Sequence, residues 1–371
     1  MTDLKPKVLV PIFTNLATDY RCYKVVCSLR DMGFEPVIIS NKTMSPLGPK
    51  WDAFEIRIIT RTTLDRGMLN FAEFILRLVP QILFFGKYQM IFVEDGFPLL
   101  VCSVFGKFLG KEVIYDSHEL WDELDSQIKN TFIKFFWVRW QAYSLLFIKK
   151  IICVSPLHIK ALKNKYPKKD YFLLPNVPFK YQESLPEQKI NHDNIKLIFS
   201  GYLRRDTNLE FLFNAIKGKE HISLTIVGEG MAFRFFKQQV EGLGIQDQVT
   251  FMGLVPFENI AGLLPGNHIG IDLLGAACSS IDLTWSNKTF DYIQAGLPVL
   301  MGTTAGHTEL NKEYQVGVQV DPESAEDIIA GIEKLVEEYA HYADNAHKAG
   351  EQLCWEHYAK GLEQFVLPQR T

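Results

Sequence analysis

The sequence predicts an α/β protein of two Rossmann-like domains, each a doubly wound parallel sheet, facing each other across a cleft. Its 371 residues exceed the roughly 250 to 300 at which a single hydrophobic core stops growing. Short β-rich runs alternate with longer helical patterns, which is typical of parallel sheets. This alternation stops once, in a polar stretch, and then begins again. Two similar domains are therefore expected.

The first series of alternating patterns ends near residue 175. Apolar, β-rich runs predict strands at 7–13, 35–40, 88–93, 112–115 and 150–154. Helical spacing predicts helices near 19–32, 69–85, 98–109 and 120–147. These elements are sufficient for one complete doubly wound sheet.

A linker is predicted at 175–194, where the chain is polar, contains prolines and has no apolar period. Beyond it, strands are predicted at 196–200, 223–227, 248–251, 269–272, 298–301 and 316–320. The expected domains are 1–185 and 186–350, followed by a last segment, 351–371, with an aromatic stripe at helical spacing. Ligands of such sheets bind at the carboxyl ends of the strands, so the active site is expected in the cleft between the domains.

The composition excludes several classes of protein. A net charge of −4 gives no general attraction to nucleic acid. The six cysteines lack Cys-x-x-Cys spacing and are interpreted as reduced thiols, which favours the cytoplasm. No apolar run approaches the roughly 20 residues of a transmembrane helix, and no secretory signal is recognised.

The most informative motif is a predicted helix start at 286–291, with Ser286, Asn287, Lys288 and Thr289 one turn ahead of Asp291. The first amides of a helix are unpaired and carry about half a positive charge. Lys288 adds a full charge, and Asp291 can accept hydrogen bonds from a ribose. This pattern predicts a site for a nucleoside diphosphate that needs no metal.

The segment 286–299, with Ala-x-Gly-x-Pro-Val at its end, resembles the donor-site helix of retaining GT-B glycosyltransferases of family 4. The resemblance implies a nucleotide-sugar donor, most simply UDP-linked, bound by residues 186–350, and an acceptor bound by residues 1–185. It also implies that 351–371 crosses back to the N-terminal domain. Gly228 and Gly230 after one strand, and Met252 and Gly253 after the next, would hold the base.

The segment 200–209 departs from the family, because the expected arginine falls on Tyr202 and the expected lysine on Thr207. Gly201 still follows the strand. Arg204 and Arg205 are therefore the predicted catalytic cations, together with Lys288, that stabilise the leaving diphosphate. The first of two family glutamates falls on Leu283, beside Asp282, while Asp291 matches the second.

On the acceptor side, Asp19 and Arg21 open a predicted helix and resemble an Asp-x-Arg start in one branch of the family. Asp116, His118 and Glu119 follow a strand and resemble the Asp-x-His-Glu turn. The resemblance implies that these five residues bind the acceptor and that His118 is catalytic. A histidine between two carboxylates can also titrate near neutral pH.

No metal site is predicted, because the sequence has neither His-x-x-x-His nor a clear Asp-x-Asp. No cofactor is expected beyond the nucleotide sugar. The basic, aromatic stretch 132–150 suggests peripheral contact with the inner face of the membrane, or else a core helix of the first domain.

The resemblance implies a metal-independent, hexosyltransferase-type enzyme that retains configuration and acts on a carbohydrate or lipid-linked acceptor in surface polysaccharide synthesis. Two alternatives remain open from the residues. A UDP-sugar 2-epimerase would share both the fold and the phosphate site. A degenerate subunit would bind a nucleotide sugar without turnover, as the residues at Tyr202, Thr207 and Leu283 would allow.

Overall fold

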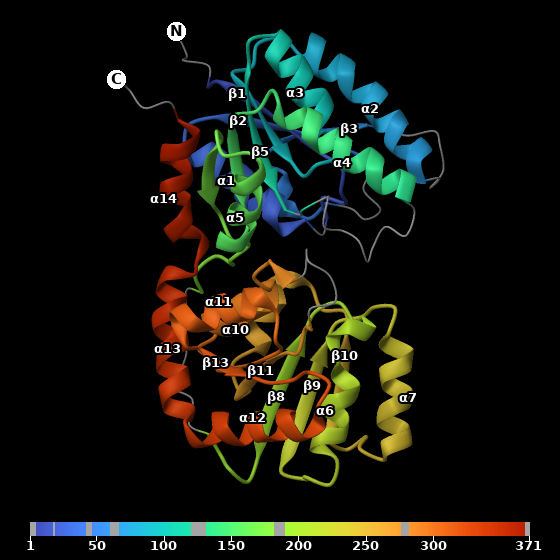
Figure 1. Ribbon diagram of the computed structural model, residues 1–371, viewed down its shortest axis with the longest axis vertical. Helices are drawn as coiled ribbons and strands as arrows, with labels where there is room; N and C mark the ends of the chain where they lie inside the picture. Colours follow the sequence, from blue (N-terminus) through green and yellow to red (C-terminus); the bar gives the residue numbers. More distant parts are fainter. Residues whose placement is uncertain are drawn as a thin grey trace. The chain divides into compact units, whose positions relative to one another are not determined.

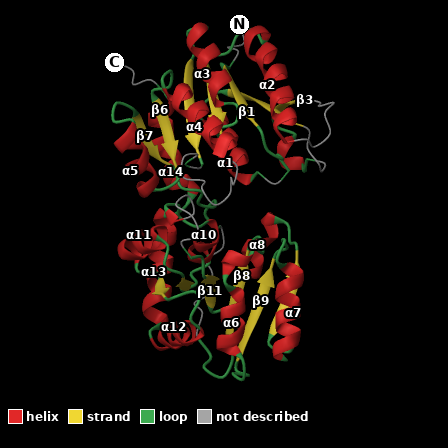
Figure 2. Ribbon diagram, turned by 45° about the vertical axis from the view of Figure 1, so that its right-hand side comes forward, coloured by secondary structure: helices red, strands yellow, loops and turns green. Residues whose placement is uncertain are grey.

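The computed structural model describes residues 5–17, 19–41, 47–59, 67–118, 120, 131–181, 190–275 and 282–367. The chain forms two compact units (Figure 1). Unit 1 runs to Pro175 and resumes at Tyr358, and unit 2 runs from Asn176 to His357. Each unit consists of one sheet and the helices that cover it (Figure 2).

Unit 1 contains a seven-stranded parallel sheet in the order β3-β2-β1-β4-β5-β6-β7. Its strands are β1 (Lys7–Ile12), β2 (Glu35–Asn41), β3 (Glu55–Ile59), β4 (Met90–Glu94), β5 (Glu112–Ser117), β6 (Lys150–Cys153) and β7 (Asp170–Leu173). The order reverses between β1 and β4, which opens a crevice at their carboxyl ends.

The helices of unit 1 are α1 (Tyr20–Asp31), α2 (Gly67–Phe84), α3 (Leu99–Phe108), α4 (Thr131–Leu145) and α5 (Pro156–Lys165), with a short 3₁₀ turn at Pro49–Trp51. Helices α2, α3 and α4 lie side by side (Figure 1). Central strands such as β4 are buried along their whole length, because helices cover both faces of a parallel sheet.

Unit 2 contains a six-stranded parallel sheet in the order β10-β9-β8-β11-β12-β13. Its strands are β8 (Ile195–Ser200), β9 (Ile222–Val227), β10 (Val249–Gly253), β11 (Ile269–Asp272), β12 (Val299–Met301) and β13 (Gly317–Gln319). The order reverses between β8 and β11, and ligands of such sheets bind at the carboxyl ends of the strands at this point.

The helices of unit 2 are α6 (Leu209–Ile216), α7 (Phe233–Leu243), α8 (Phe257–Leu263), α10 (Asn287–Gln294), α11 (Ala305–Tyr314), α12 (Ala325–Glu337) and α13 (Tyr339–Gln352), with a 3₁₀ turn at Arg205–Thr207. Aliphatic side chains of β8, β9 and β11 form the centre of the core with those of α6 and α12. This packing fixes the strand ends that carry the candidate donor residues.

The two-sheet α/β fold predicted from the sequence is confirmed, and most predicted strands lie within a few residues of their observed bounds. Strands β3 and β7 were not predicted. Both are edge strands, and β3 carries exposed charge at Arg57, so neither shows the apolar run of a central strand. The first part of the helix expected at 120–147 lies outside the described residues.

The unit boundaries differ from those expected at 185 and 350. Unit 2 begins at Asn176, and within it the backbone N–H of Tyr181 donates to Gln294 of α10 at 3.3 Å. The last helix, α14 (Trp355–Val366), joins unit 1 from Tyr358 on. There Phe365 stacks on Phe172 with ring centroids 5.4 Å apart.

Candidate functional site

In unit 2, a buried carboxylate forms an ion pair with Lys288, the lysine that is predicted to bind the diphosphate. Asp272 is the last residue of β11 and is fully buried. Its Oδ1 accepts from Lys288 Nζ at 2.6 Å, and its Oδ2 accepts from the Thr289 hydroxyl at 2.8 Å. His307 Nε2 lies 3.2 Å from the same Oδ2. The first turn of α10 and the start of α11 therefore meet at the end of β11.

Asp272 stays ionised in this setting. Burial alone would raise the pKa of its carboxyl, but the charge of Lys288 and the interaction with His307 hold it well below its usual range. Lys288 is thus fixed by a full negative charge, and its ammonium keeps further hydrogens for a second acceptor. The Lys288 side chain is 14% exposed, which leaves it within reach of a ligand.

The amino end of α10 has the open cap that an anion site requires. Ser286 is the N-cap, yet its side chain makes no cap hydrogen bond. Its hydroxyl lies 3.4 Å from Lys288 Nζ instead. Asn287 is exposed, whereas Thr289 is fully buried against Asp272 and thus supports the lysine from inside. An uncapped helix start beside a lysine attracts phosphate oxygens.

The loops that follow β8, β9 and β10 are joined by backbone hydrogen bonds. Gly201 N donates to Val227 O at 2.9 Å, and Gly228 N donates to Gly253 O at 2.8 Å. A Cβ at Gly228 would collide with the carbonyl oxygen of Gly201, and one at Gly230 would collide with the backbone of Leu203. Glycine is required here because two loops touch.

The two predicted arginines have different surroundings. The Arg204 Nε donates to Asp206 at 2.9 Å, and its side chain is 38% exposed. The Arg205 guanidinium lies over the ring of Phe235, 3.5 Å from its centroid, on helix α7. A half-exposed ion pair is weak and easily exchanged, whereas stacking on a ring anchors the guanidinium.

The predicted ribose ligand Asp291 is only 7% exposed, and its Oδ1 accepts from the Tyr181 hydroxyl at 3.5 Å. Met252 is 46% exposed beside Gly253. Asp282, the neighbour of the missing family glutamate, accepts from Ala305 N at 2.7 Å and caps α11. Its carboxylate therefore has a structural partner at a helix start.

In unit 1, Arg21 and Asp116 form a buried, two-point ion pair. Arg21 Nη2 donates to Asp116 Oδ1 at 2.7 Å, and Arg21 Nε donates to Oδ2 at 2.9 Å. Arg21 also donates to Leu174 O at 3.1 Å. Asp19 caps α1 through Cys22 N at 2.9 Å and accepts from Thr14 at 2.8 Å. The predicted pair Asp19 and Arg21 thus lies at the start of one helix, against the end of β5.

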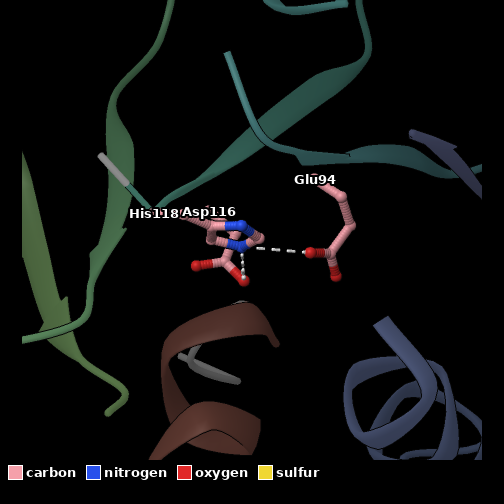
Figure 3. Close-up of side chains that lie close together, drawn as sticks. All are labelled: Glu94, Asp116 and His118. Atoms are coloured by element: carbon pink, nitrogen blue, oxygen red, sulfur yellow. Dashed lines mark ion pairs between the residues drawn. The ribbon is translucent and has the colours of Figure 1, made fainter. Parts of the chain in front are cut away.

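His118 lies between two carboxylates (Figure 3). Its Nε2 is 3.2 Å from Asp116 Oδ2 and 3.3 Å from Glu94 Oε2. Arg21 Nε lies 3.0 Å from His118 Nε2 and shares its single hydrogen between this nitrogen and Asp116 Oδ2. The two carboxylates within 3.3 Å favour a proton on His118 Nε2.

The titration of this cluster follows from its charges. Burial would lower the pKa of His118, but the charge of Asp116 and hydrogen bonds to Asp116 and Glu94 raise it well above its ordinary value. Burial and the charge of Asp116 raise the pKa of Glu94 to about 7. Burial would also raise the pKa of Asp116, but Arg21 and His118 hold it well below its usual range. These charges favour the protonated form of His118, which can donate hydrogen bonds.

Glu94, Asp116 and His118 are the one group of metal-ligand type found among the described residues. Both Asp116 oxygens already accept from the Arg21 guanidinium, and His118 Nε2 lies within 3.3 Å of both carboxylates. A divalent cation would have to displace these contacts and lie next to a permanent positive charge. The donor set therefore fits a proton-mediated network better than a metal.

The sequence interpretation missed two residues at these sites, Glu94 and Asp272. Each ends a buried apolar strand with a carboxylate, at the edge where the sheet order reverses. A search for acids at the ends of predicted strands would have found both. The predicted acceptor residue Glu119 lies outside the described residues.

Comparison with known proteins bears on this arrangement. Residues 180–352 match the family described as Glycosyl transferases group 1. The uncharacterized glycosyltransferase MJ1607 of Methanocaldococcus jannaschii is 23% identical over 189 residues, 47% of this chain and 47% of the relative. The O-antigen biosynthesis glycosyltransferase WbnH of Escherichia coli is 26% identical over 172 residues, 46% of each chain. The chain spans about half the length of the curated relatives that it matches.

Among solved structures, Alr3699/HepE of Anabaena, in complex with UDP, is similar with a TM-score of 0.72 and 12% identity, over 97% of this chain and 99% of that one. At this identity the likeness concerns the fold. The fold is that of the GT-B glycosyltransferases, and the match to the glycosyl transferases group 1 family falls within unit 2.

Proposed function

We propose that the protein is a glycosyltransferase of GT-B family 4, which transfers a sugar from a UDP-linked donor to a hydroxyl of a carbohydrate or lipid-linked acceptor, with retention. The observation that carries the proposal is the Asp272–Lys288 pair at the open start of α10, where the order of the unit 2 sheet reverses. The group 1 match of this region and the UDP complex of the similar HepE support the choice of donor.

In this proposal the diphosphate lies at the start of α10. Lys288, Ser286 and Asn287 bind its oxygens, and Arg204 exchanges its contact with Asp206 for a phosphate oxygen. The glycine loops at 228–230 and 252–253 hold the base by their backbone, and Asp291 accepts from the ribose. The protein's own cations balance the charge of the diphosphate, so the reaction proceeds without a metal ion.

The transfer step needs stabilisation of the leaving group more than it needs a base. The bond between sugar C1 and the phosphate oxygen breaks, and its electron pair goes to the phosphate. The acceptor hydroxyl then attacks C1 from the same face and passes its proton to that phosphate oxygen. Lys288 and Arg204 stabilise the charge that grows on the phosphate, where electrostatic catalysis is strongest.

Unit 1 binds the acceptor at the ends of β1, β4 and β5. Asp116 and Glu94 raise the pKa of His118. The protonated imidazole donates a hydrogen bond that orients an oxygen of the sugar or of the acceptor. Asp19 and Arg21 at the start of α1, together with Asp116 of β5, hold the turn in place. The O-antigen biosynthesis in the name of the relative WbnH supports a product in cell-surface polysaccharide synthesis. The proposed site of action is the cytoplasm.

The test is incubation with a panel of nucleotide sugars, with and without EDTA, scoring free nucleotide. Release of UDP from one UDP-sugar in the presence of EDTA is expected. The anomeric configuration of a product formed with a carbohydrate acceptor, read by NMR, should match that of the donor. Loss of release in EDTA would contradict metal independence, an epimeric product would favour an epimerase, and binding without release would favour a binding subunit.

A further inference from the structure

Most of the large apolar side chains that are exposed in the described part of the chain belong to three helices of unit 1. These helices, α2, α3 and α4, are neighbours (Figure 1). The exposed side chains include Leu76 (74% exposed) and Phe84 (82%) on α2, Phe108 (82%) at the end of α3, and Phe135 (60%) on α4. We call this surface the α2–α4 face. A soluble monomer rarely exposes so many large apolar groups together, and such patches mark contact sites.

The opposite sides of these helices pack in the core of unit 1. The exposed apolar residues are therefore not needed for that core. Trp137 of α4 is 5% exposed and packs on Phe71 of α2, with ring centroids 4.8 Å apart. Trp140 packs on the same ring at 5.3 Å. Helix α4 is therefore apolar on both its buried and its outer side, a pattern expected of a helix covered on all sides.

The charge of the face indicates what covers it. Neither 99–111 nor 131–150 contains an acid, and the basic residues there include Lys107 and Arg139, both exposed. On α2 the one acid, Glu73, is paired with Arg77 at 2.9 Å. The chain as a whole has a net charge of −4, so this positive face is local. Cations around exposed aromatic and aliphatic groups match an anionic lipid surface, where the apolar groups enter the boundary below the headgroups.

A second copy of the chain fits this face less well. In a two-fold dimer each side presents the same patch, so the cations near Lys107 and Arg139 would lie against their own copies. A membrane-spanning role is also not supported, since no helix in the described ranges is long and apolar enough to cross a bilayer. An interfacial position, with the three helices lying on the surface, satisfies both the charge and the apolar area.

We infer that the α2–α4 face binds the surface of an anionic phospholipid bilayer. The inference does not depend on the proposed transferase activity, because binding can be measured without a donor or an acceptor. It extends the membrane contact predicted for 132–150 to two further helices. It would also bring unit 1 to a lipid-linked acceptor if the proposed function is correct.

The experiment is flotation of the full chain with vesicles of phosphatidylcholine alone or mixed with phosphatidylglycerol, at rising NaCl concentration. Binding is expected only to the mixed vesicles and should weaken with salt. Phe108→Gln with Phe135→Gln should lower the partition coefficient at least tenfold, and Lys107→Glu with Arg139→Glu should do the same. All four side chains are partly or fully outside the core, so thermal unfolding should stay close to that of the wild type.

Matched controls come from unit 2, where Met231 is 84% exposed and Lys237 is exposed on α7. Met231→Gln and Lys237→Glu should leave vesicle binding unchanged. Failure of the wild-type protein to float with mixed vesicles would overturn the inference, as would equal losses in the control variants. A dimer in solution that the α2–α4 variants disrupt, without vesicle binding, would show that a second copy covers the face instead.

Discussion

Lys288 has two partners to satisfy, the buried carboxylate of Asp272 and the proposed diphosphate. The first contact is present in the structure at 2.6 Å and holds the ammonium in place. Such positioning lowers the entropic cost of binding, because the side chain does not need to be ordered by the ligand. The same contact also neutralises part of the charge that the ligand would feel. The two effects can be separated by substituting each member of the pair.

Lys288→Ala should weaken UDP binding by roughly 1.5 to 3 kcal/mol, which is about tenfold to about 150-fold in Kd, because a charge-assisted contact is lost. It should also lower the free energy of unfolding, since Asp272 is left as an unpaired buried charge. Asp272→Asn should keep UDP affinity or raise it, since the lysine charge is no longer offset.

Calorimetry on the folded variants measures the Kd of UDP. Lys237→Ala is the control for the removal of an exposed lysine of the same unit. Unchanged UDP affinity in folded Lys288→Ala would exclude the start of α10 from the site. Equal weakening by both substitutions would mean that the pair only maintains the fold.

The two arginines should differ in their effect on turnover. Arg204→Ala should lower kcat about tenfold or more, while the Kd of UDP changes little, because charge on the leaving group grows in the transition state. Arg205→Ala should leave kcat nearly unchanged, since its guanidinium is stacked on Phe235. Single-turnover rates on both variants provide the measurement. The assignment of Arg204 fails if both variants turn over at the wild-type rate, or if Arg205→Ala is the slower one.

At the scale of elements, parallel register places the acidic ends of two neighbouring strands beside each other. Glu94 of β4 is paired in register with Asp116 of β5, and His118 follows one residue beyond the end of β5. The helix start at Asp19 brings Arg21 to the same edge. No single element contains this cluster, which depends on the strand order.

Glu94→Gln should remove an inflection near pH 7 from the pH profile of kcat/KM for transfer. Burial raises the pKa of Glu94 to about 7, so the wild-type residue gains its charge as pH rises through that value. The new charge strengthens the ion pair with His118⁺, and transfer should therefore rise with pH. Arg21 and Asp116 also face this group, and their ion pair holds the pKa of the Asp116 carboxyl well below its usual range and raises the pKa of Arg21.

The profile of the Glu94→Gln variant should be flat over this range, with UDP affinity as in the wild type. An inflection that persists in the variant would assign the titration to another group. A loss of UDP affinity would show that Glu94 acts through the fold of the whole chain rather than through His118.

The parts of the fold that were predictable from the sequence are those with a strong apolar period. Strands such as β1 and β9 can be recognised in the sequence by their apolar residues. The charged edge strand β3 has no such pattern. Site prediction had a similar limit. Lys288 and His118 stand in recognisable local motifs, but their carboxylate partners Asp272 and Glu94 are 16 and 24 residues away in sequence and meet them only after folding.

At the scale of the whole molecule, the chain passes between the two units twice, after Pro175 and after His357. Unit 1 is therefore completed by the C-terminal part of α14, which Phe365 joins to Phe172 of β7. Each unit has its own sheet and its own reversal point, and the two charged clusters lie in different units. This separation predicts that substrate binding and transfer respond to different substitutions.

His118→Ala should leave UDP affinity unchanged and slow sugar transfer at least tenfold, about 1.4 kcal/mol of barrier. The physical reason is that the residue belongs to unit 1, whereas every proposed UDP contact belongs to unit 2. UDP calorimetry and transfer rates on the same preparation provide the comparison, with Lys288→Ala as the opposite case. A parallel fall of both quantities would mean that His118 supports the fold, and no change in either would remove it from the reaction.

The hydrogen-bonded glycine loops of unit 2 also bear on how such a protein can evolve. Backbone hydrogen bonds join these loops, whereas the neighbouring side chains of Tyr202, Glu229 and Met252 are exposed. Those positions are free to diversify while Gly228 and Gly230 cannot accept a side chain without separating the loops. The scaffold and the variable positions therefore alternate along the same few residues, so a lineage could explore new donor preferences without first rebuilding the loops that present them.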